Sequence, residues 1–302
     1  MLVKVKEPQR SERARLRPDQ ILFSYLHLAA DARQCSELVA SGATCIAYET
    51  VTGTGGGLPL LAPMSEVAGR MSVQAAAHHL ERAHGGRGIL LGGVPGVAPG
   101  KLLVLGAGVV GSHATQMAVG TGAQIVVIDR SLDALRRIDR LFGARVTTVY
   151  SNRANVEEHV LAADVVIGGV LIPGAAAPKL VSRELVSRMR KGAVVVDVAI
   201  DQGGCFATSR ATTHTRPTYL VDGVVHYCVA NMPGGVPRTS TYALNNATLP
   251  FVLALANKGW KQALRDDAHL CNGLNVAAGK VTYRAIAEEL GYTYHAAQAI
   301  LA

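Results

Sequence analysis

The sequence of 302 residues is poor in aromatic and charged residues. Phe, Trp and Tyr make up 5% of the chain, so a platform of stacked aromatics for single-stranded nucleic acid is not expected. Charged residues make up 17% and hydrophobic residues 49%, which excludes intrinsic disorder of the whole chain. The 32 glycines follow no three-residue period, which excludes a collagen helix. The chain is long enough to fold around a sizeable core.

Cysteines and long apolar runs are also scarce. The five cysteines are widely spaced and form no Cys-x-x-Cys pair, so neither a disulfide framework nor a cysteine zinc site is expected. No continuous apolar run reaches the ~20 residues of a membrane span, and the first residues lack the apolar core of a signal peptide. Lys and Arg (30) outnumber Asp and Glu (22), which favours anionic ligands, but no nucleic-acid-binding motif is present. We expect a soluble, cytoplasmic protein with no nucleic-acid or membrane partner.

From residue 101 onward, short apolar runs alternate with amphipathic helical patterns. Strands that are apolar throughout are typical of a parallel sheet with both faces covered. We therefore predict an α/β fold with a doubly wound parallel sheet of the Rossmann type. Its strands are expected at 102–105, 124–128, 145–149, 164–167 and 193–198, and its helices at 109–120, 131–142, 154–163 and 182–190.

The predicted Rossmann domain covers residues 61–237, and residues 1–60 with 238–302 form a second, discontinuous α/β lobe. A helix is expected to open at 63–66, with Ser65 as its N-cap, and to run to His84 before two glycines. The first 60 residues contain strand candidates at 3–5, 21–26 and 44–48. The tail is expected to be helical, and its long helix at 241–258 is a candidate interface for a homo-oligomer.

A dinucleotide-binding fingerprint follows the first predicted Rossmann strand. Gly106, Gly108 and Gly111 form Gly-x-Gly-x-x-Gly between a strand and a helix, and the next strand ends at Asp129. The glycines allow a tight turn, close approach of a pyrophosphate and close helix packing, while Asp129 would bind ribose hydroxyls and repel a 2′-phosphate. This favours NAD, although Arg130 could pair with a 2′-phosphate of NADP. The alternative is a glycine-rich turn without a ligand.

Several polar residues are candidates for chemistry, and each has a purely structural alternative. His27 lies in an apolar run and could be a core histidine. Asp201 follows an apolar strand, at the edge where such sheets bind ligands, and could instead cap a helix. Lys6 could lie on a solvated strand face, and Asn231 could form a turn. We expect no metal site at the three helical histidines His78, His79 and His84, because no cysteine or paired carboxylate accompanies them at ligand spacing.

Together these segments resemble the alanine dehydrogenase/transhydrogenase N-terminal-domain family, and bacterial alanine dehydrogenases in particular. The resemblance spans almost the whole chain through VKVKEP (3–8), ILFSYLHLAA (21–30), AYETV (47–51), LPLLAPMSEVAGRM (58–71), GGRGILLGGVPGV (85–97), PGAAAPKLVS (173–182), VVVDVAIDQGG (194–204) and VANMPGGVPRTSTYALNN (229–246). It implies His27 and Asp201 as the catalytic pair and Lys6 as a substrate contact. The implied cofactor contacts, besides the glycines, are Ser65, Val109, Val110, Asp129, Ser151, Val170, Leu171, Val198, Ala199, Ile200, Asp201, Arg210, Val229, Ala230, Asn231 and Met232.

The resemblance implies NAD-dependent oxidative deamination of L-alanine to pyruvate and ammonia, and the reverse reductive amination. Family members form homo-oligomers. They carry a strand–helix–strand region before VKVKEP, with an arginine for the substrate carboxylate, so the substrate lobe is expected to be N-terminally truncated. Two alternatives follow: a non-catalytic NAD-binding protein or assembly partner, and the NAD(H)-binding component of a transhydrogenase.

Overall fold

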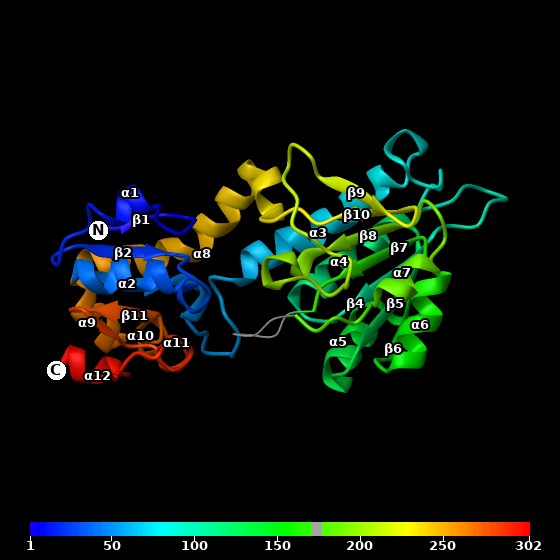
Figure 1. Ribbon diagram of the computed structural model, residues 1–302. Coiled ribbons are helices and arrows are strands. Elements are labelled where there is room, and N and C mark those ends of the chain that lie inside the picture. The colour runs from blue at the N-terminus through cyan, green and yellow to red at the C-terminus, as the bar shows by residue number, and fades with distance from the viewer. Residues whose placement is uncertain (171–176) are drawn as a thin grey trace. The chain divides into compact units, whose positions relative to one another are not determined.

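The computed structural model describes residues 1–170 and 177–302, and the chain divides into two compact units. One unit combines Met1–Pro63 with Thr241–Ala302, and the other comprises Met64–Ser240. The boundaries fall within two helices, α3 (Ala62–His79) and α8 (Pro237–Lys258). Each unit has a sheet of its own (Figure 1). Each also has its own cluster of buried hydrophobic residues.

The unit Met64–Ser240 is built on a sheet with the strand order β6-β5-β4-β7-β8-β10-β9. Neighbouring strands are parallel except β9, which pairs antiparallel with β10. The chain winds outward from β4 in one direction and then from β7 in the other, so the predicted doubly wound Rossmann fold is confirmed. The strands are β4 (Lys101–Leu105), β5 (Gln124–Asp129), β6 (Val146–Tyr150), β7 (Val165–Gly168), β8 (Val194–Asp197), β9 (Thr218–Val221) and β10 (Val224–Tyr227).

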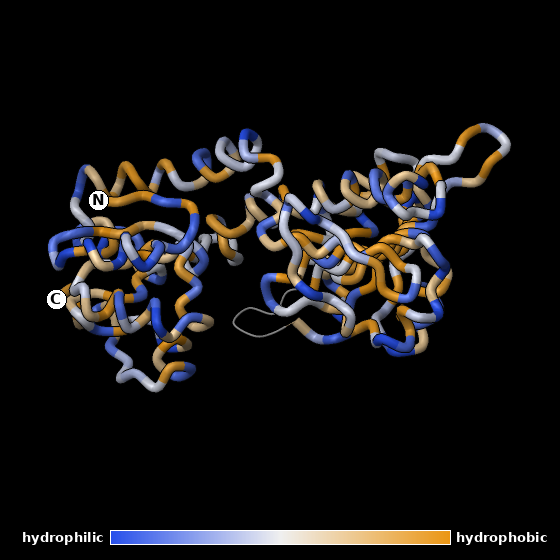
Figure 2. Tube along the Cα trace, turned by 45° about the horizontal axis from the view of Figure 1, so that its top comes forward, coloured by the Kyte–Doolittle hydropathy of each residue, from blue (hydrophilic) through white to orange (hydrophobic). Residues whose placement is uncertain are grey.

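Alternate residues of the central strands pack on opposite faces of this sheet. Leu102 and Val104 belong to a buried cluster that includes residues of α3, α4 and α5, whereas Leu103 and Leu105 belong to one with residues of α6 and α7. In Figure 2 the hydrophobic colour is concentrated along these strands. Besides α3, the helices of the unit are η3 (Arg82–His84), α4 (Val109–Thr121), α5 (Leu132–Phe142), η4 (Gly143–Arg145), α6 (Arg153–Ala162), α7 (Arg183–Ser187), η5 (Val198–Gln202) and η6 (Met232–Gly235).

The prediction for helix α3 was wrong at both ends. The helix starts at Ala62, so Ser65 lies in its first turn and is not its N-cap. Pro63 is compatible with this earlier start, because a proline in the first helical turn removes no helical hydrogen bond. The helix ends at His79, and the chain continues into the short helix η3, which stops at Gly85 with a φ of 86°. The glycine stop expected for α3 therefore belongs to η3.

The unit Met1–Pro63 with Thr241–Ala302 has a five-stranded sheet in the order β1-β2-β3-β11-β12. The first three strands are parallel, and β11 and β12 continue the sheet antiparallel. The tail, which was expected to be helical, thus also supplies two strands. All four residues of β11 are buried, and this strand pairs with β3. The elements are β1 (Leu2–Val3), α1 (Arg10–Arg13), β2 (Ile21–Ser24), η1 (Leu28–Ala30), α2 (Ala32–Ser41), β3 (Thr44–Ala47), η2 (Tyr48–Thr50), α9 (Trp260–Asp266), α10 (Ala268–Cys271), β11 (Leu274–Ala277), β12 (Lys280–Val281), α11 (Arg284–Leu290) and α12 (Ala297–Leu301).

Two further features concern the whole described chain. The five cysteines are buried free thiols. Across residues 1–170 and 177–302, no helix has both the length and the apolar character that crossing a lipid bilayer requires.

Candidate active site

Two glycines of the fingerprint are required by the fold itself. Gly106 follows β4 with a φ of 100°, and a Cβ on it would lie 2.9 Å from the carbonyl oxygen of Gly169. A Cβ on Gly111 would lie 1.8 Å from the carbonyl oxygen of Gly106. No side chain fits at such distances, so these glycines let α4 start directly against the end of the sheet.

Gly108 differs from Gly106 and Gly111 because no contact within the protein requires a glycine at this position. It is the N-cap of α4, with an extended backbone, and a Cβ on it would meet no atom within 4 Å. The open space lies over the N-terminus of a 13-residue helix, where unpaired N–H groups and the helix dipole favour a phosphate group. A glycine turn without a ligand accounts for Gly106 and Gly111 but leaves Gly108 unexplained, so this cradle fits a dinucleotide pyrophosphate.

Asp129 holds its carboxylate next to the glycine turn. One oxygen, Oδ2, accepts a hydrogen bond from the backbone N–H of Ala107 at 2.6 Å, and Oδ1 accepts one from Ser131 at 2.7 Å. The residue ends β5, which is the direct neighbour of β4. An acid in this place is suited to accept hydrogen bonds from ribose hydroxyls. Arg130 is exposed beside it.

Most other expected cofactor positions follow the carboxyl ends of parallel strands. These ends meet at one edge of the sheet, where open α/β sheets bind their ligands. Val109 and Val110 open α4, and the others follow β6, β7, β8 and β10: Ser151, Val170, Val198, Ala199, Ile200, Val229, Ala230, Asn231 and Met232. Leu171 lies outside the described residues, and Ser65 lies within α3.

Two of the expected cofactor residues have evident structural contacts. The guanidinium of Arg210 lies 4.2 Å from the ring centroid of Tyr219, and the backbone N–H of Arg210 donates to the Tyr219 hydroxyl at 2.8 Å. Asn231 has a φ of 57° and is the N-cap of η6, so it forms the turn that its sequence context suggested.

Asp201 lies inside the short helix η5, directly after β8, and is exposed. The N-cap of η5 is Asp197, so Asp201 is not a capping residue. The buried Asp197 accepts hydrogen bonds from Ser209 Oγ at 2.5 Å and from the backbone N–H of Cys205 at 2.9 Å. Burial raises the pKa of Asp197 although these hydrogen bonds oppose the shift. Asp197 therefore ties the following loop to the sheet and fixes the segment that carries Asp201.

His27 is not a core histidine, although its neighbours in sequence are apolar. Its side chain is 46% exposed, and its backbone lies in the left-handed region with a φ of 47°. Its Nδ1 lies 2.6 Å from Oε1 of Glu7, while the backbone N–H groups of His27 and Leu26 donate to Glu49 at 2.6 and 3.2 Å. Two carboxylates therefore hold His27, one at its ring and one at its backbone.

These carboxylates change the proton affinity of the imidazole. Desolvation opposes protonation, but the hydrogen bond to Glu7 and the negative charges of Glu49 and Glu7 outweigh it and raise the pKa of His27. Burial of Glu7 acts against ionisation, yet its hydrogen bonds and the charges of Lys6 and His27 lower its pKa to about 2. Glu7 is therefore a carboxylate at neutral pH.

The two lysines of the first motif have different partners. Lys4 pairs with Glu12 at 2.5 Å, whereas Nζ of Lys6 lies 3.6 Å from Oε2 of Glu7 and its side chain is half exposed. The strand β1 stops at Val3, so the expected strand over 3–5 is shorter and does not include either lysine. Lys6, Glu7 and His27 thus gather in the unit Met1–Pro63 with Thr241–Ala302, while Asp201, Asp129 and the glycine turn belong to Met64–Ser240.

Sequence reasoning missed three carboxylates that shape these sites. Glu7 and Glu49 both lie inside quoted motifs, VKVKEP and AYETV, and Asp197 is the first acid of VVVDVAIDQGG. In each case the feature that could have identified the carboxylate was its position, next to an apolar strand or next to a residue already selected as a candidate. It also overlooked Glu81, which the structure places between His78 and His84 in a group of possible metal ligands.

Comparisons with known proteins agree over both units. The model of "Alanine dehydrogenase/PNT, N-terminal domain" matches residues 1–68, and that of "Alanine dehydrogenase/PNT, C-terminal domain" matches residues 72–284. The chain is 60% identical to an alanine dehydrogenase of Halomonas elongata and 54% identical to that of Bacillus subtilis, covering 100% of this chain and 81% and 80% of those proteins.

Solved structures give the same result. A structure of an L-alanine dehydrogenase superimposes with a TM-score of 0.91 at 54% identity, covering 95% of this chain and 80% of that one. A transhydrogenase from Sinorhizobium meliloti shares the fold, with a TM-score of 0.80 at 24% identity, covering 93% of this chain and 81% of that one. The chain belongs to the alanine dehydrogenase/PNT family.

Proposed function

We propose that this chain catalyses the NAD-dependent oxidative deamination of L-alanine, and its reverse. L-Alanine, NAD⁺ and water give pyruvate, ammonium, NADH and a proton. The observation that carries the proposal is the likeness to alanine dehydrogenases over the whole chain, at 60% and 54% identity and with a TM-score of 0.91. The open glycine cradle and the histidine held by carboxylates supply the chemical parts that this reaction requires.

The unit Met64–Ser240 would hold the cofactor. Its glycine turn and the N-terminus of α4 suit the pyrophosphate, and Asp129 suits the adenosine ribose and disfavours a 2′-phosphate. A bound NAD⁺ would supply the acceptor for the hydride that leaves C2 of the amino acid. Val198, Ala199 and Ile200 after β8, and Val229–Met232 after β10, would line the remainder of the cofactor site.

His27 would move protons at its Nε2 atom. Because Nδ1 faces the carboxylate of Glu7, the neutral ring carries its proton on Nδ1 and leaves Nε2 as a base. After hydride loss, water must add to the imine carbon and ammonia must leave, and each step transfers a proton. His27 at Nε2 can take a proton from water and return one to the departing nitrogen.

Asp201 and Lys6 are the other two residues that would act on the substrate or on water. Asp201 is an exposed acid directly after β8, so its carboxylate is suited to orient water or to transfer a proton. The half-exposed ammonium of Lys6 is suited to pair with the substrate carboxylate and to polarise the oxygen of pyruvate. The unit that carries Lys6 and His27 would thus serve as the substrate lobe.

The direct test is NADH absorbance when the purified chain is mixed with L-alanine and NAD⁺ at alkaline pH, where the reacting amine is neutral. Saturable NADH formation supports the proposal. NAD⁺ binding without turnover at any alanine concentration would instead assign a non-catalytic NAD-binding role. Hydride exchange between NADH and an NADP analogue in the presence of a partner subunit, without any turnover of alanine, would assign a transhydrogenase component.

A homo-oligomer completes the proposal. Helix α8 leaves Tyr242, Leu249 and Leu253 exposed, and their spacings of seven and four residues put them on one face. An apolar stripe of this kind suits the same helix of a second copy. Sedimentation should show an oligomer, and Leu253→Glu should lower its mass without unfolding the chain. A wild-type chain that sediments as a monomer would contradict this part of the proposal.

A further inference from the structure

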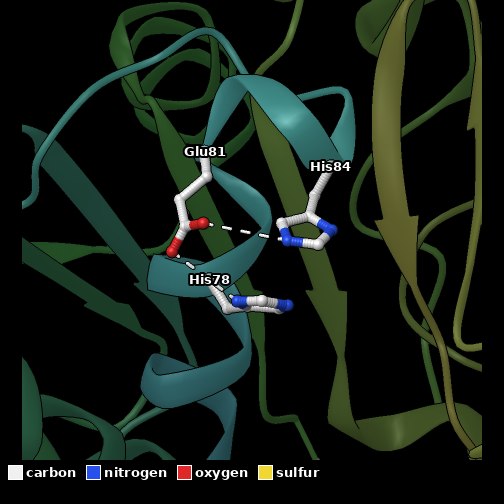
Figure 3. Close-up of side chains that lie close together, drawn as sticks. All are labelled: His78, Glu81 and His84. Carbon is white, nitrogen blue, oxygen red and sulfur yellow. Dashed lines mark ion pairs between the residues drawn. The ribbon is translucent and has the colours of Figure 1, made fainter.

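A second group of chemically active side chains lies at the end of helix α3, apart from the residues discussed above. His78 lies in the last turn of α3, Glu81 follows the helix, and His84 ends η3. The spacing of three residues between neighbours brings all three side chains to one side of the turn (Figure 3). All three are exposed.

The carboxylate of Glu81 faces both imidazole rings. Its Oε1 lies 3.6 Å from Nδ1 of His78, and its Oε2 lies 3.7 Å from Nε2 of His84. The two rings lie close to each other, with centroids 3.9 Å apart. One ligand atom from each residue lies within 4.8 Å of the other two. Three donors therefore converge on one small volume.

The backbone that carries these donors is firmly held. The N–H of Gly88 donates to the carbonyl of Leu80 at 2.8 Å, and the N–H of Gly86 donates to that of Glu81 at 3.1 Å. A Cβ on Gly86 would lie 2.3 Å from the carbonyl oxygen of His79, so the chain returns tightly against the end of α3. The turn is thus preformed, and only exposed side chains must move to accept a ligand.

From this geometry, we propose that His78, Glu81 and His84 bind one divalent transition-metal ion of the Zn²⁺ class. Two imidazole nitrogens and one carboxylate oxygen are ligands that Zn²⁺ and other divalent first-row transition metals prefer, whereas Mg²⁺ and Ca²⁺ prefer oxygen ligands alone. Donors around a tetrahedral Zn²⁺, each ~2.1 Å from the ion, lie about 3.4 Å apart. The separations of 3.6 Å to Oε1 and 3.7 Å to Oε2 of Glu81 are close to this value, and one ligand atom from each residue lies within 4.8 Å of the other two, so rotation of these exposed side chains can bring three donors to one ion.

Space beside the group can complete the coordination. His78 and His84 both line a cleft of about 630 Å³, together with His79, His214 and Tyr227. Water in this cleft can occupy the remaining coordination positions of the ion. A bound ion would join the last turn of α3 to η3, and it would therefore stabilise this part of the unit without touching the glycine turn. The site is independent of the proposed dehydrogenase activity.

Isothermal titration of the metal-free chain with ZnCl₂ tests the site, with MgCl₂ as the comparison ion. We expect one Zn²⁺ to bind per chain, no binding of Mg²⁺ at the same concentration, and a Tm that rises with Zn²⁺. His84→Ala and Glu81→Gln should each weaken Zn²⁺ binding about tenfold or more. His159→Ala, a half-buried histidine on α6, is the matched control and should bind as the unchanged chain does.

Cobalt gives a second readout that needs no enzyme activity. Co²⁺ bound by two imidazoles and a carboxylate should show visible d–d absorption bands that Zn²⁺ abolishes and that are missing in His84→Ala. The far-ultraviolet circular dichroism of each variant checks that it is folded. The proposal is overturned if the chain binds no Zn²⁺, or if folded His84→Ala and Glu81→Gln bind Zn²⁺ as tightly as the unchanged chain.

Discussion

Oε1 of Glu7 lies 2.6 Å from Nδ1 of His27, and this contact sets both the orientation and the proton affinity of the ring. A carboxylate at Nδ1 fixes the tautomer and leaves Nε2 for the substrate, and it stabilises the imidazolium when the ring is protonated. Both residues lie in the quoted segments VKVKEP (3–8) and ILFSYLHLAA (21–30), but sequence reasoning selected only the histidine.

Glu7→Gln should lower turnover by about 10- to 100-fold, because the ring loses its charged partner and part of its orientation. The pKa of His27 is raised by Glu7, so the substitution lowers it. The neutral ring then persists to lower pH. The acidic limb of the kcat profile for deamination should move to lower pH, and so should the alkaline limb for reductive amination, which needs the protonated ring.

Glu12→Gln is the matched control, since Glu12 pairs with Lys4 in the same unit and does not contact His27. It should leave the pH profile unchanged. An unshifted profile in Glu7→Gln would show that Glu7 only packs against the ring and does not tune it.

The parts of the fold that follow from local pattern could be predicted. The uniformly apolar runs at β4, β5, β7 and β8 gave the parallel sheet, because strands covered on both faces leave no polar alternation. Strand β11 was missed, because its four residues, Leu-Asn-Val-Ala, are too few to distinguish a strand from a helix among helical patterns. Its partner β3 lies more than 200 residues earlier in the chain.

The residues of the candidate site also fall into two groups, those that the local sequence predicts and those that it does not. Gly106, Gly111 and Asp129 follow a motif whose spacing is set by one strand and one helix, so their positions could be predicted. Glu7 and Glu49 act on His27 across 20 and 22 residues of sequence, and no periodicity links them. Such partners depend on how strands pair, which local sequence does not encode.

His27→Ala and Asp201→Asn should each lower turnover by at least ~10²-fold, the usual effect of losing an acid or base. NADH binding, measured by fluorescence titration, should change little in His27→Ala, because His27 lies outside the unit Met64–Ser240. Asp133→Asn, an exposed acid on α5, is the control for Asp201→Asn. Near-normal turnover in a folded variant would return that residue to a structural role.

Asp129→Ala should weaken the binding of NAD⁺ and raise the activity with NADP⁺ relative to that with NAD⁺. The substitution removes the acceptor for ribose hydroxyls and the charge that repels a 2′-phosphate, while Arg130 stays available to pair with that phosphate. The ratio of kcat/KM for NAD⁺ to that for NADP⁺ should fall by about tenfold or more. Asp133→Ala should keep the ratio. An unchanged ratio in Asp129→Ala would place the ribose elsewhere.

Replacing Gly108 and Gly111 with alanine should have different effects on the stability of the protein. Alanine at Gly111 puts a Cβ 1.8 Å from the carbonyl oxygen of Gly106, so α4 must shift from the sheet. Such overpacking costs about 1–3 kcal/mol or more of unfolding free energy, and Tm should fall. Alanine at Gly108 meets nothing within 4 Å and has an ordinary φ of −72°, so Tm should stay within about a degree of its original value.

The cofactor distinguishes the two variants further. The methyl group of Gly108→Ala projects over the N-terminus of α4, where the pyrophosphate would lie, so the Kd for NADH should rise about tenfold or more while the fold is retained. Thermal denaturation and NADH titration of the same two samples make the comparison. A Gly108→Ala variant that keeps both its Tm and its NADH affinity would exclude the pyrophosphate from this cradle, because nothing in the protein requires a glycine there.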